Sequence, residues 1–177
     1  GVYGQSKFAG EQAVRESVSR YIILRTAWVF GAHGNNFVKT MLRLASDKSE
    51  LSIVADQVGA PTSARAISAV IASIVFQMLD AEVDDDRWGT YHFSGQPYVS
   101  WADFAYEIFH QAMELEIIGS QPKVNHIGTI EYPTPAARPA NSRLDCSKLK
   151  STFGIEPDDW KASLGLVLDE LKEGIQN

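Results

Sequence analysis

Cysteine is almost absent from this chain. Cys146 is the only one among 177 residues, so no internal disulfide can form. A small secreted scaffold held by disulfides is therefore excluded, and a single thiol suits a reducing compartment. We expect a fold held by its hydrophobic core and a cytoplasmic location.

Excess positive charge and long apolar runs are also missing. Lys and Arg together number 16 against 22 Asp and Glu, which gives a formal net charge of −6. Such a surface has no general attraction for nucleic acid or anionic lipid. The longest largely apolar run, residues 66–79, contains two serines and Gln77, and it falls short of the roughly 20 apolar residues that span a bilayer. We expect neither a nucleic-acid partner nor a membrane partner.

Two kinds of ligand-binding motif are missing as well. No Gly-x-x-Gly-x-x-Gly turn occurs among the 13 glycines, so the sequence offers no dinucleotide phosphate loop. The four histidines are scattered, with no i, i+4 pair and no cysteine nearby. We therefore predict no metal site.

What is present is an ordinary globular composition with alternating helices and strands. Apolar residues make up 45% of the chain and charged residues 21%. Hydrophobic periodicity predicts helices over residues 4–18, 37–45, 64–80, 101–115 and 160–174, a short helix ending at residue 154, and strands over 21–30, 51–55, 89–95 and 124–130. This alternation indicates an α/β fold.

Polar residues mark the predicted helix starts. Asn35 or Asn36 precedes the second helix, and Thr62 or Ser63 precedes the third. Ser100 is followed three positions later by an aspartate, which resembles a capping box with Asp in place of Glu. These residues give the predicted boundaries a physical reason.

Tyr3 and Lys7 form the first candidate catalytic pair. They lie four residues apart in a predicted helix, so a phenol and an ammonium share one face. The cation favours the phenolate form, which allows the phenol to work as a general acid near neutral pH. The alternative is a plain helix start with Tyr3 packed inward and Lys7 solvated.

Four segments carry a family resemblance. They are residues 3–11 (YGQSKFAGE), 24–31 (LRTAWVFG), 56–62 (DQVGAPT) and 137–145 (ARPANSRLD). The first two resemble the extended short-chain dehydrogenases/reductases, and the last two narrow the resemblance to the dTDP-4-dehydrorhamnose reductase family. The resemblance runs from residue 1 to about residue 165.

The resemblance implies a domain organisation. It indicates the C-terminal part of a Rossmann-type extended short-chain reductase plus the smaller substrate-binding domain. Residues 1–31 would end the dinucleotide-binding domain, and residues 32–177 would mainly build the substrate-binding domain, with returns to the cofactor domain around 35–55 and 89–110. The N-terminal glycine-rich half is expected to be missing. The chain alone is therefore expected to be inactive, and to expose apolar surface or to self-associate, for example as a homodimer.

The resemblance also implies a reaction. The family reduces the C4 ketone of dTDP-4-dehydro-L-rhamnose to dTDP-L-rhamnose with NADPH or NADH. Tyr3 would give the proton, and Lys7 would hold the phenol and hydrogen-bond the ribose of the cofactor. Some relatives carry magnesium through a glutamate after the Pro-Thr turn, but Arg65 stands at that position here, which makes a magnesium ion doubtful.

Six residues are candidates for binding the nucleotide-sugar substrate: Trp28, Gln57, Thr62, Arg138, Asn141 and Arg143. The resemblance makes Trp28 a sugar contact, although a core tryptophan is the alternative. Gln57 and Thr62 would line the pocket, but turn formation and helix capping explain them nearly as well. The guanidinium groups suit a diphosphate, with Asn141 between them, while Arg143 alternatively forms a structural ion pair.

Two other functions stay open. Fold and a Tyr/Lys pair do not determine the substrate, so another nucleotide-sugar reductase or epimerase is possible. A non-catalytic regulatory subunit, resembling that of methionine adenosyltransferase, is the alternative from a different class.

Overall fold

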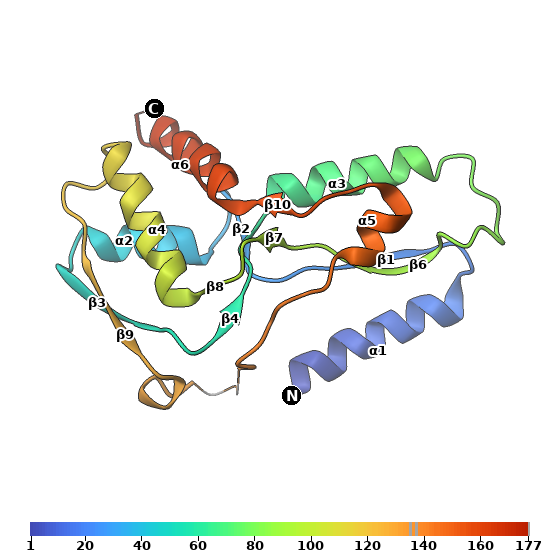
Figure 1. Ribbon diagram of the computed structural model, residues 1–177, viewed down its shortest axis with the longest axis horizontal. Helices are drawn as coiled ribbons and strands as arrows, with labels where there is room; N and C mark the ends of the chain where they lie inside the picture. Colours follow the sequence, from blue (N-terminus) through green and yellow to red (C-terminus); the bar gives the residue numbers. More distant parts are fainter. Residues whose placement is uncertain (135, 137, 177) are drawn as a thin grey trace.

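The computed structural model describes residues 1–134, 136 and 138–176, and it alternates helices with short strands (Figure 1). The helices are α1 (Val2–Ser17), α2 (Phe37–Ala45), α3 (Ala64–Gln77), α4 (Trp101–Glu114), the 3-10 turn η1 (Thr129–Glu131), α5 (Ser147–Phe153) and α6 (Trp160–Gln176). The strands are β1 (Ile22–Arg25), β2 (Val29–Phe30), β3 (Glu50–Val54), β4 (Val58–Gly59), β5 (Thr62–Ser63), β6 (Gly89–His92), β7 (Gly95–Gln96), β8 (Val99–Ser100), β9 (Lys123–Ile127) and β10 (Asp158–Asp159). The predicted α/β class is confirmed.

The strands pair two by two, and most pairs are parallel. β1 pairs with β6, β2 with β5, β3 with β9, and β7 with β10, all in parallel, while β4 and β8 are antiparallel. A parallel pair needs a long crossover, which the intervening helices supply. Strands far apart in sequence are thereby brought side by side.

One hydrophobic core surrounds α4. Its inward face, including Phe104, Ile108 and Phe109, is fully buried against α2, α6, β3 and β9. The start of α4 is secured by the predicted capping box: Ser100 accepts a hydrogen bond from the Asp103 amide, and Asp103 accepts one from the Ser100 amide. These elements gather on one side of the molecule in Figure 1.

A second core lies beside β1 and β6. Val70 and Ile74 of α3 pack with Tyr91 of β6 and with Leu149 and Phe153 of α5. The segments that share this core with β1 thus come from residues 66–93 and 149–155. Residues 38–53, in contrast, pack in the core around α4. β6 pairs with β1, and the assignment of residues 35–55 and 89–110 to the cofactor domain stays a prediction.

α1 contributes no buried residue to either core. It lies along the β1–β6 side of the molecule (Figure 1), and Val2, Phe8 and Val14 on it are exposed. α3 also exposes apolar side chains, with Phe76 75% exposed. The apolar surface that the sequence led us to expect is therefore present.

Local predictions are mostly confirmed. Asn36 caps α2 and Ser63 caps α3, each accepting a hydrogen bond from a first-turn amide. Gly154 ends α5 in the left-handed conformation, with φ of 68°. None of the helices in the described segments is long and apolar enough to cross a membrane.

Three predicted strands are wrong in length, and one of them, predicted over residues 89–95, ends at His92 before β7 begins at Gly95. The strand predicted over residues 21–30 is interrupted, because Trp28 has a left-handed backbone, with φ of 48°, and the chain then pairs with a different partner. The extended segment predicted over 124–130 ends at Ile127, after which η1 begins. In the segment 21–30, tertiary pairing overrides a continuous apolar start.

Candidate functional site

Tyr3 and Lys7 lie on the exposed side of α1. The Lys7 ammonium is over the Tyr3 ring, 5.5 Å from its centroid, as expected for residues one turn apart. Tyr3 is 77% exposed, so it is not packed inward. Among the described residues, neither the Tyr3 hydroxyl nor the Lys7 ammonium has a hydrogen bond or an ion pair. Both polar groups are available to a ligand.

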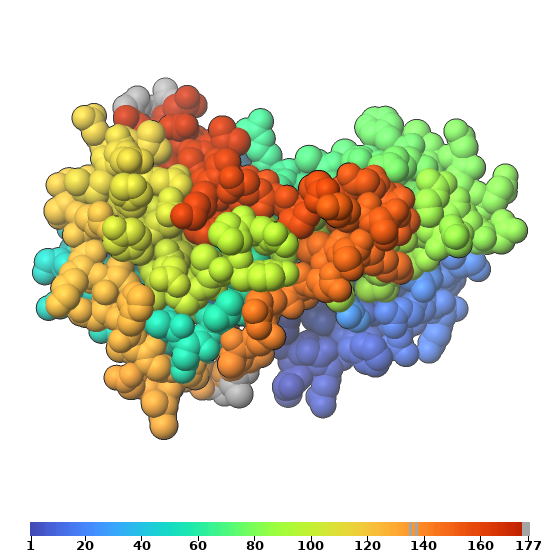
Figure 2. Space-filling model, in the orientation of Figure 1, coloured from blue at the N-terminus to red at the C-terminus, as the bar shows by residue number. Residues whose placement is uncertain are grey.

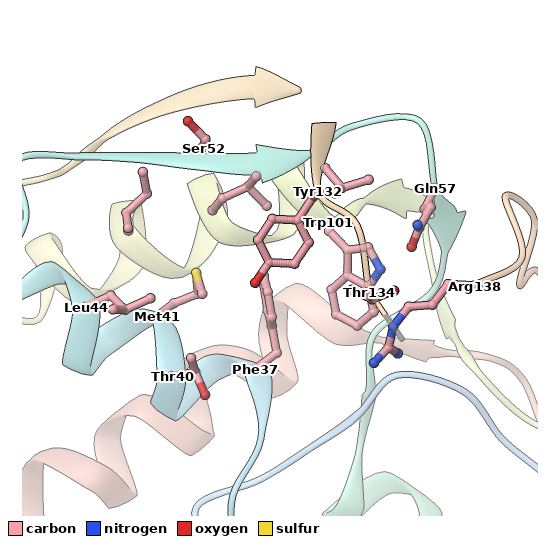
Figure 3. A pocket seen from close by; sticks show the side chains of 13 residues that line it. Phe37, Thr40, Met41, Leu44, Ser52, Gln57, Trp101, Tyr132, Thr134 and Arg138 are labelled. Atoms are coloured by element: carbon pink, nitrogen blue, oxygen red, sulfur yellow. The ribbon is translucent and has the colours of Figure 1, made fainter. Parts of the chain in front are cut away.

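A cavity of about 490 Å³ opens where α2, β3 and the start of α4 meet the segment after β9. Figure 3 shows Gln57 and Arg138 at one end of it and Met41 and Leu44 at the other. Its lining combines three aromatic side chains with aliphatic and neutral polar ones: Phe37, Trp101, Tyr132, Thr40, Met41, Leu44, Leu51, Ser52, Ile53, Val54, Gln57, Thr134 and Arg138. Arg138 is the one charged residue of this lining within the described chain.

Trp28 reaches this cavity indirectly. Its indole stacks on that of Trp101, with ring centroids 3.6 Å apart and planes 13° from parallel. Gly59 leaves room for the stack, because a Cβ there would lie 2.5 Å from Cε2 of Trp28. The positive φ of Trp28 costs roughly 1–3 kcal/mol, and such backbone strain is often kept at functional sites. Trp28 is therefore half-buried, stacked on Trp101 and packed against the core around α4, and its contact with a sugar stays a prediction.

Gln57 belongs to a polar clamp between two loops. Its side chain is 6% exposed and donates a hydrogen bond to the Thr129 hydroxyl. The neighbouring Asp56 carboxylate accepts hydrogen bonds from the Thr129 hydroxyl and amide. The hydrogen bond from the Thr129 hydroxyl contributes most to lowering the pKa of Asp56, and the bond from the Thr129 amide lowers it further. The clamp holds η1 and thereby the segment that carries Tyr132 beside the cavity.

The segment after residue 137 is tied to β4. The Val58 amide donates to the Ala140 carbonyl, and the Ser142 amide donates to the Val58 carbonyl. Asn141 accepts hydrogen bonds from the amide and the Nε of Arg143. The Arg143 guanidinium also lies 5.8 Å from the ring centroid of Tyr98. Ala137, the first residue of the motif that suggested this site, lies outside the described residues.

Thr62 lies away from the cavity. It is fully buried, donates to the Ala60 carbonyl and accepts from the Gly95 amide. Its hydroxyl therefore supports the backbone where β5 meets β7. A direct contact of Thr62 with substrate stays a prediction.

The structure brings the predicted site residues together in separate groups. Tyr3 and Lys7 form one group, Gln57 and Arg138 line one cavity, and Asn141 and Arg143 form a third group joined by hydrogen bonds. No hydrogen bond among the described residues joins the Tyr3/Lys7 pair to the cavity. In the space-filling view, a notch separates the first residues of α1, in blue, from the orange segment around residue 140 (Figure 2).

Sequence reasoning missed the aromatic lining of the cavity. Neither Trp101 nor Tyr132 was among the candidate residues. Phe37 contacts Trp101, with 4.7 Å between the ring centroids. A cluster of aromatic residues at the starts of two helices was the available signal.

The described residues contain no group of three or more His, Cys, Asp or Glu side chains that could hold a metal ion. Arg65 lines a second cavity of about 480 Å³, together with His33 and Glu170, whose Nε2 and Oε1 atoms lie 3.4 Å apart. A cation there disfavours a metal ion at this position.

The family model described as "RmlD substrate binding domain" matches residues 1–173. The chain belongs to this family. It is homologous to dTDP-4-dehydrorhamnose reductases: it is 48% identical over 163 residues to the one from Aggregatibacter actinomycetemcomitans and 51% identical over 162 residues to the one from Sinorhizobium fredii. The family resemblance that the four sequence segments indicated is confirmed.

The match covers most of this chain but only part of the relatives. It includes 92% of the chain and 55% and 54% of the two relatives, so the chain spans about half their length. A crystal structure of dTDP-4-dehydrorhamnose reductase from Bacillus anthracis in complex with NADP superposes with a TM-score of 0.82 at 36% identity. That match covers 96% of this chain and 55% of the Bacillus chain. The fold of the family is thus present over nearly the whole chain.

Proposed function

We propose that this chain works within an NAD(P)H-dependent reductase that converts dTDP-4-dehydro-L-rhamnose into dTDP-L-rhamnose. The observation that carries the proposal is the cavity at Arg138, where three aromatic side chains and one guanidinium line about 490 Å³. The homology to dTDP-4-dehydrorhamnose reductases supports the same reaction. Residues 1–31 would complete the cofactor domain, and residues 32–177 would mainly form the substrate-binding domain.

The cavity suits the two parts of a nucleoside diphosphate. The faces of Phe37, Trp101 and Tyr132 offer stacking and apolar contact to a base. The Arg138 guanidinium offers a planar fork of donors to a phosphate group. Gln57 adds an amide beside the same space. Asn141 and Arg143 would extend the phosphate site along the segment that follows Arg138.

Tyr3 would act as the proton donor to the sugar carbonyl. Its hydroxyl is exposed, and the Lys7 ammonium lies over its ring, where a cation stabilises the phenolate left after proton transfer. Trp28, in its stack on Trp101, would hold the sugar between the nucleotide cavity and Tyr3. The adjacent pair on α1 argues against the regulatory-subunit alternative, which needs no such pair.

The residues present fit a nicotinamide cofactor. Tyr3 and Lys7 present a hydroxyl and an ammonium that have no hydrogen bond or ion pair among the described residues, and both can donate hydrogen bonds to ribose hydroxyls. The bound cofactor supplies the hydride. The structure of the Bacillus relative contains NADP, which favours NADPH over NADH for this chain.

The cysteine content and the exposed apolar side chains bear on the cellular compartment and on the assembly of the reductase. A single buried cysteine is suited to the cytoplasm. The exposed apolar side chains of α1 and α3 suit a homodimer or a further part of the reductase.

The test uses the full-length reductase that carries this chain, with NADPH deuterated at the transferred position. We expect one NADPH oxidised per dTDP-4-dehydro-L-rhamnose, with deuterium found at C4 of the product. The 177-residue chain alone should leave NADPH unconsumed. A product formed without net oxidation of cofactor would contradict the proposal and favour the epimerase alternative.

A further inference from the structure

A network of charged groups joins α1 to the β1–β6 pair. The Arg25 guanidinium on β1 donates from Nε to one oxygen of Glu11, at 2.7 Å, and from Nη2 to the other, at 2.6 Å. Arg15 donates to the same carboxylate at 3.2 Å and to the Thr90 hydroxyl on β6 at 3.0 Å. Among the described residues, the Arg25–Glu11 and Arg15–Thr90 bonds are the side-chain hydrogen bonds that hold α1 against the sheet.

Glu11 shares a helix face with the catalytic pair. Tyr3, Lys7, Glu11 and Arg15 follow one another at intervals of four, so each lies one turn from the next. A carboxylate four residues after a lysine is within reach of its ammonium. The structure nevertheless shows no Lys7–Glu11 ion pair within the described chain, and the ammonium lies over the Tyr3 ring instead.

The reason is that Arg25 already occupies both oxygens of Glu11. A bidentate guanidinium–carboxylate pair is stronger than a single exposed lysine contact. The Glu11 side chain is only 14% exposed beneath this pair. The hydrogen bond from Arg25 also lowers the pKa of Glu11, so the carboxylate stays charged and bound to Arg25.

We propose that Arg25 is a positioning residue for the reaction, because it binds the Glu11 carboxylate and so leaves the Lys7 ammonium at Tyr3. Arg25 touches neither Tyr3 nor Lys7; it acts through Glu11. Because Tyr3 and Lys7 are catalytic only under the proposed function, this role of Arg25 rests on that function.

The decisive comparison is between Arg25→Met and the double variant Arg25→Met/Glu11→Gln in the full-length reductase. In Arg25→Met, Glu11 loses its bidentate partner and keeps only the 3.2 Å bond from Arg15. The carboxylate can then also pair with Lys7, and we expect kcat/KM to fall by about tenfold, since charges in a substrate-filled site are weakly screened. The double variant has no carboxylate to capture Lys7, and we expect it to recover to within about threefold of Glu11→Gln alone. If Arg25 only stabilises the packing of α1 against the sheet, kcat/KM of the double variant will be as low as that of Arg25→Met.

A second readout does not depend on activity. Trace acetylation with acetic anhydride, followed by peptide mass spectrometry, measures how available the Lys7 amine is relative to exposed Lys48. We expect Arg25→Met to lower the relative reactivity of Lys7 by about twofold, the size expected for an i, i+4 pair, and the double variant to restore it. Unchanged Lys7 reactivity in Arg25→Met would overturn the proposal.

Two further variants separate this role from folding. Arg87→Met breaks another bidentate pair of similar exposure, with Asp85, at a loop far along the chain from α1, and it should leave kcat/KM and Lys7 reactivity unchanged. Arg25→Lys keeps a cation beside Glu11 and should retain Lys7 reactivity even if the bidentate geometry is lost. Loss of Lys7 reactivity in Arg25→Lys would also count against the proposal.

Failure of the proposed function gives a different pattern. Wild-type enzyme that does not oxidise NADPH with dTDP-4-dehydro-L-rhamnose, or full activity in Tyr3→Phe, overturns both proposals together. Normal wild-type activity, an inactive Tyr3→Phe and no rescue in the double variant overturn only the role of Arg25.

Discussion

At the scale of single residues, the site depends on close contacts between side chains, and the residue types alone do not predict which side chains will meet. Trp28 and Trp101 stack face to face beside the cavity, and the space for Trp28 exists because residue 59 has no Cβ. Trp28 could be predicted as a candidate from the family resemblance. Its partner could not, because the two tryptophans are 73 positions apart and meet only through the β4–β8 and β2–β5 pairs.

Gly59→Ala should therefore disturb the stack. The new Cβ would lie 2.5 Å from Cε2 of Trp28, so the indole has to move. We expect a loss of about 1–3 kcal/mol in the free energy of unfolding, typical of overpacking, together with a changed near-ultraviolet circular dichroism spectrum. Gly119→Ala is the control, since a Cβ there has nothing within 4 Å. Equal stability of the two variants would show that the stack tolerates the methyl group.

Asp85 gives a prediction for pH dependence. Hydrogen bonds from Arg87 lower the pKa of Asp85 from 3.8 to about 2. A carboxyl whose pKa is lower in the folded state stabilises the fold above its unfolded pKa, and this contribution is lost as pH falls towards the folded value. The difference in urea midpoint between wild type and Asp85→Asn should thus be constant above pH 5 and shrink between about pH 4 and pH 2.

The same pH dependence should weaken when the Arg87 side chain is removed. In an Arg87→Met background only the amide of residue 87 still donates to Asp85, so the midpoint difference caused by Asp85→Asn should shrink less between pH 6 and pH 3 than it does in wild type. An equally large pH dependence in that background would assign the lowered pKa to groups other than the Arg87 guanidinium.

At the scale of elements, helix starts were the most predictable features. Asn36, Ser63 and the Ser100–Asp103 box are local signals, and each caps the helix that it was expected to cap. Strand ends were less predictable, because they depend on partners. The break after Arg25 arises from Trp28 and from pairing of the next residues with β5, neither of which is encoded in the local apolar pattern.

Ser100→Ala tests the capping box. The substitution removes the acceptor for the Asp103 amide at the start of α4, the helix at the centre of the larger core. We expect the free energy of unfolding to fall by about 1 kcal/mol, within the usual range for lost caps. Ser68→Ala on the exposed face of α3 should leave stability nearly unchanged or raise it slightly. A Ser100→Ala variant as stable as that control would mean that the box contributes nothing.

At the scale of the whole molecule, the family and the α/β class could be predicted from sequence, whereas the arrangement of the site could not. Four short motifs identified the family because each carries a special residue type at a characteristic spacing. The cavity is built from residues 37 to 138, joined by the β3–β9 pair and by the Asp56–Thr129 clamp. Such long-range pairing is a property of the folded chain, so Trp101 and Tyr132 could be recognised only in the structure.

The measurement that tests the central claim most directly is steady-state turnover of dTDP-4-dehydro-L-rhamnose by the full-length Tyr3→Phe reductase, with NADPH affinity measured on the same samples by nicotinamide fluorescence. Removing one hydroxyl removes the proton donor, so kcat should fall by about 10²- to 10⁴-fold while cofactor affinity stays nearly unchanged. Tyr106→Phe, which alters an exposed phenol on α4, should behave as wild type. Near-normal turnover in Tyr3→Phe would contradict the role of Tyr3 and with it the proposed mechanism.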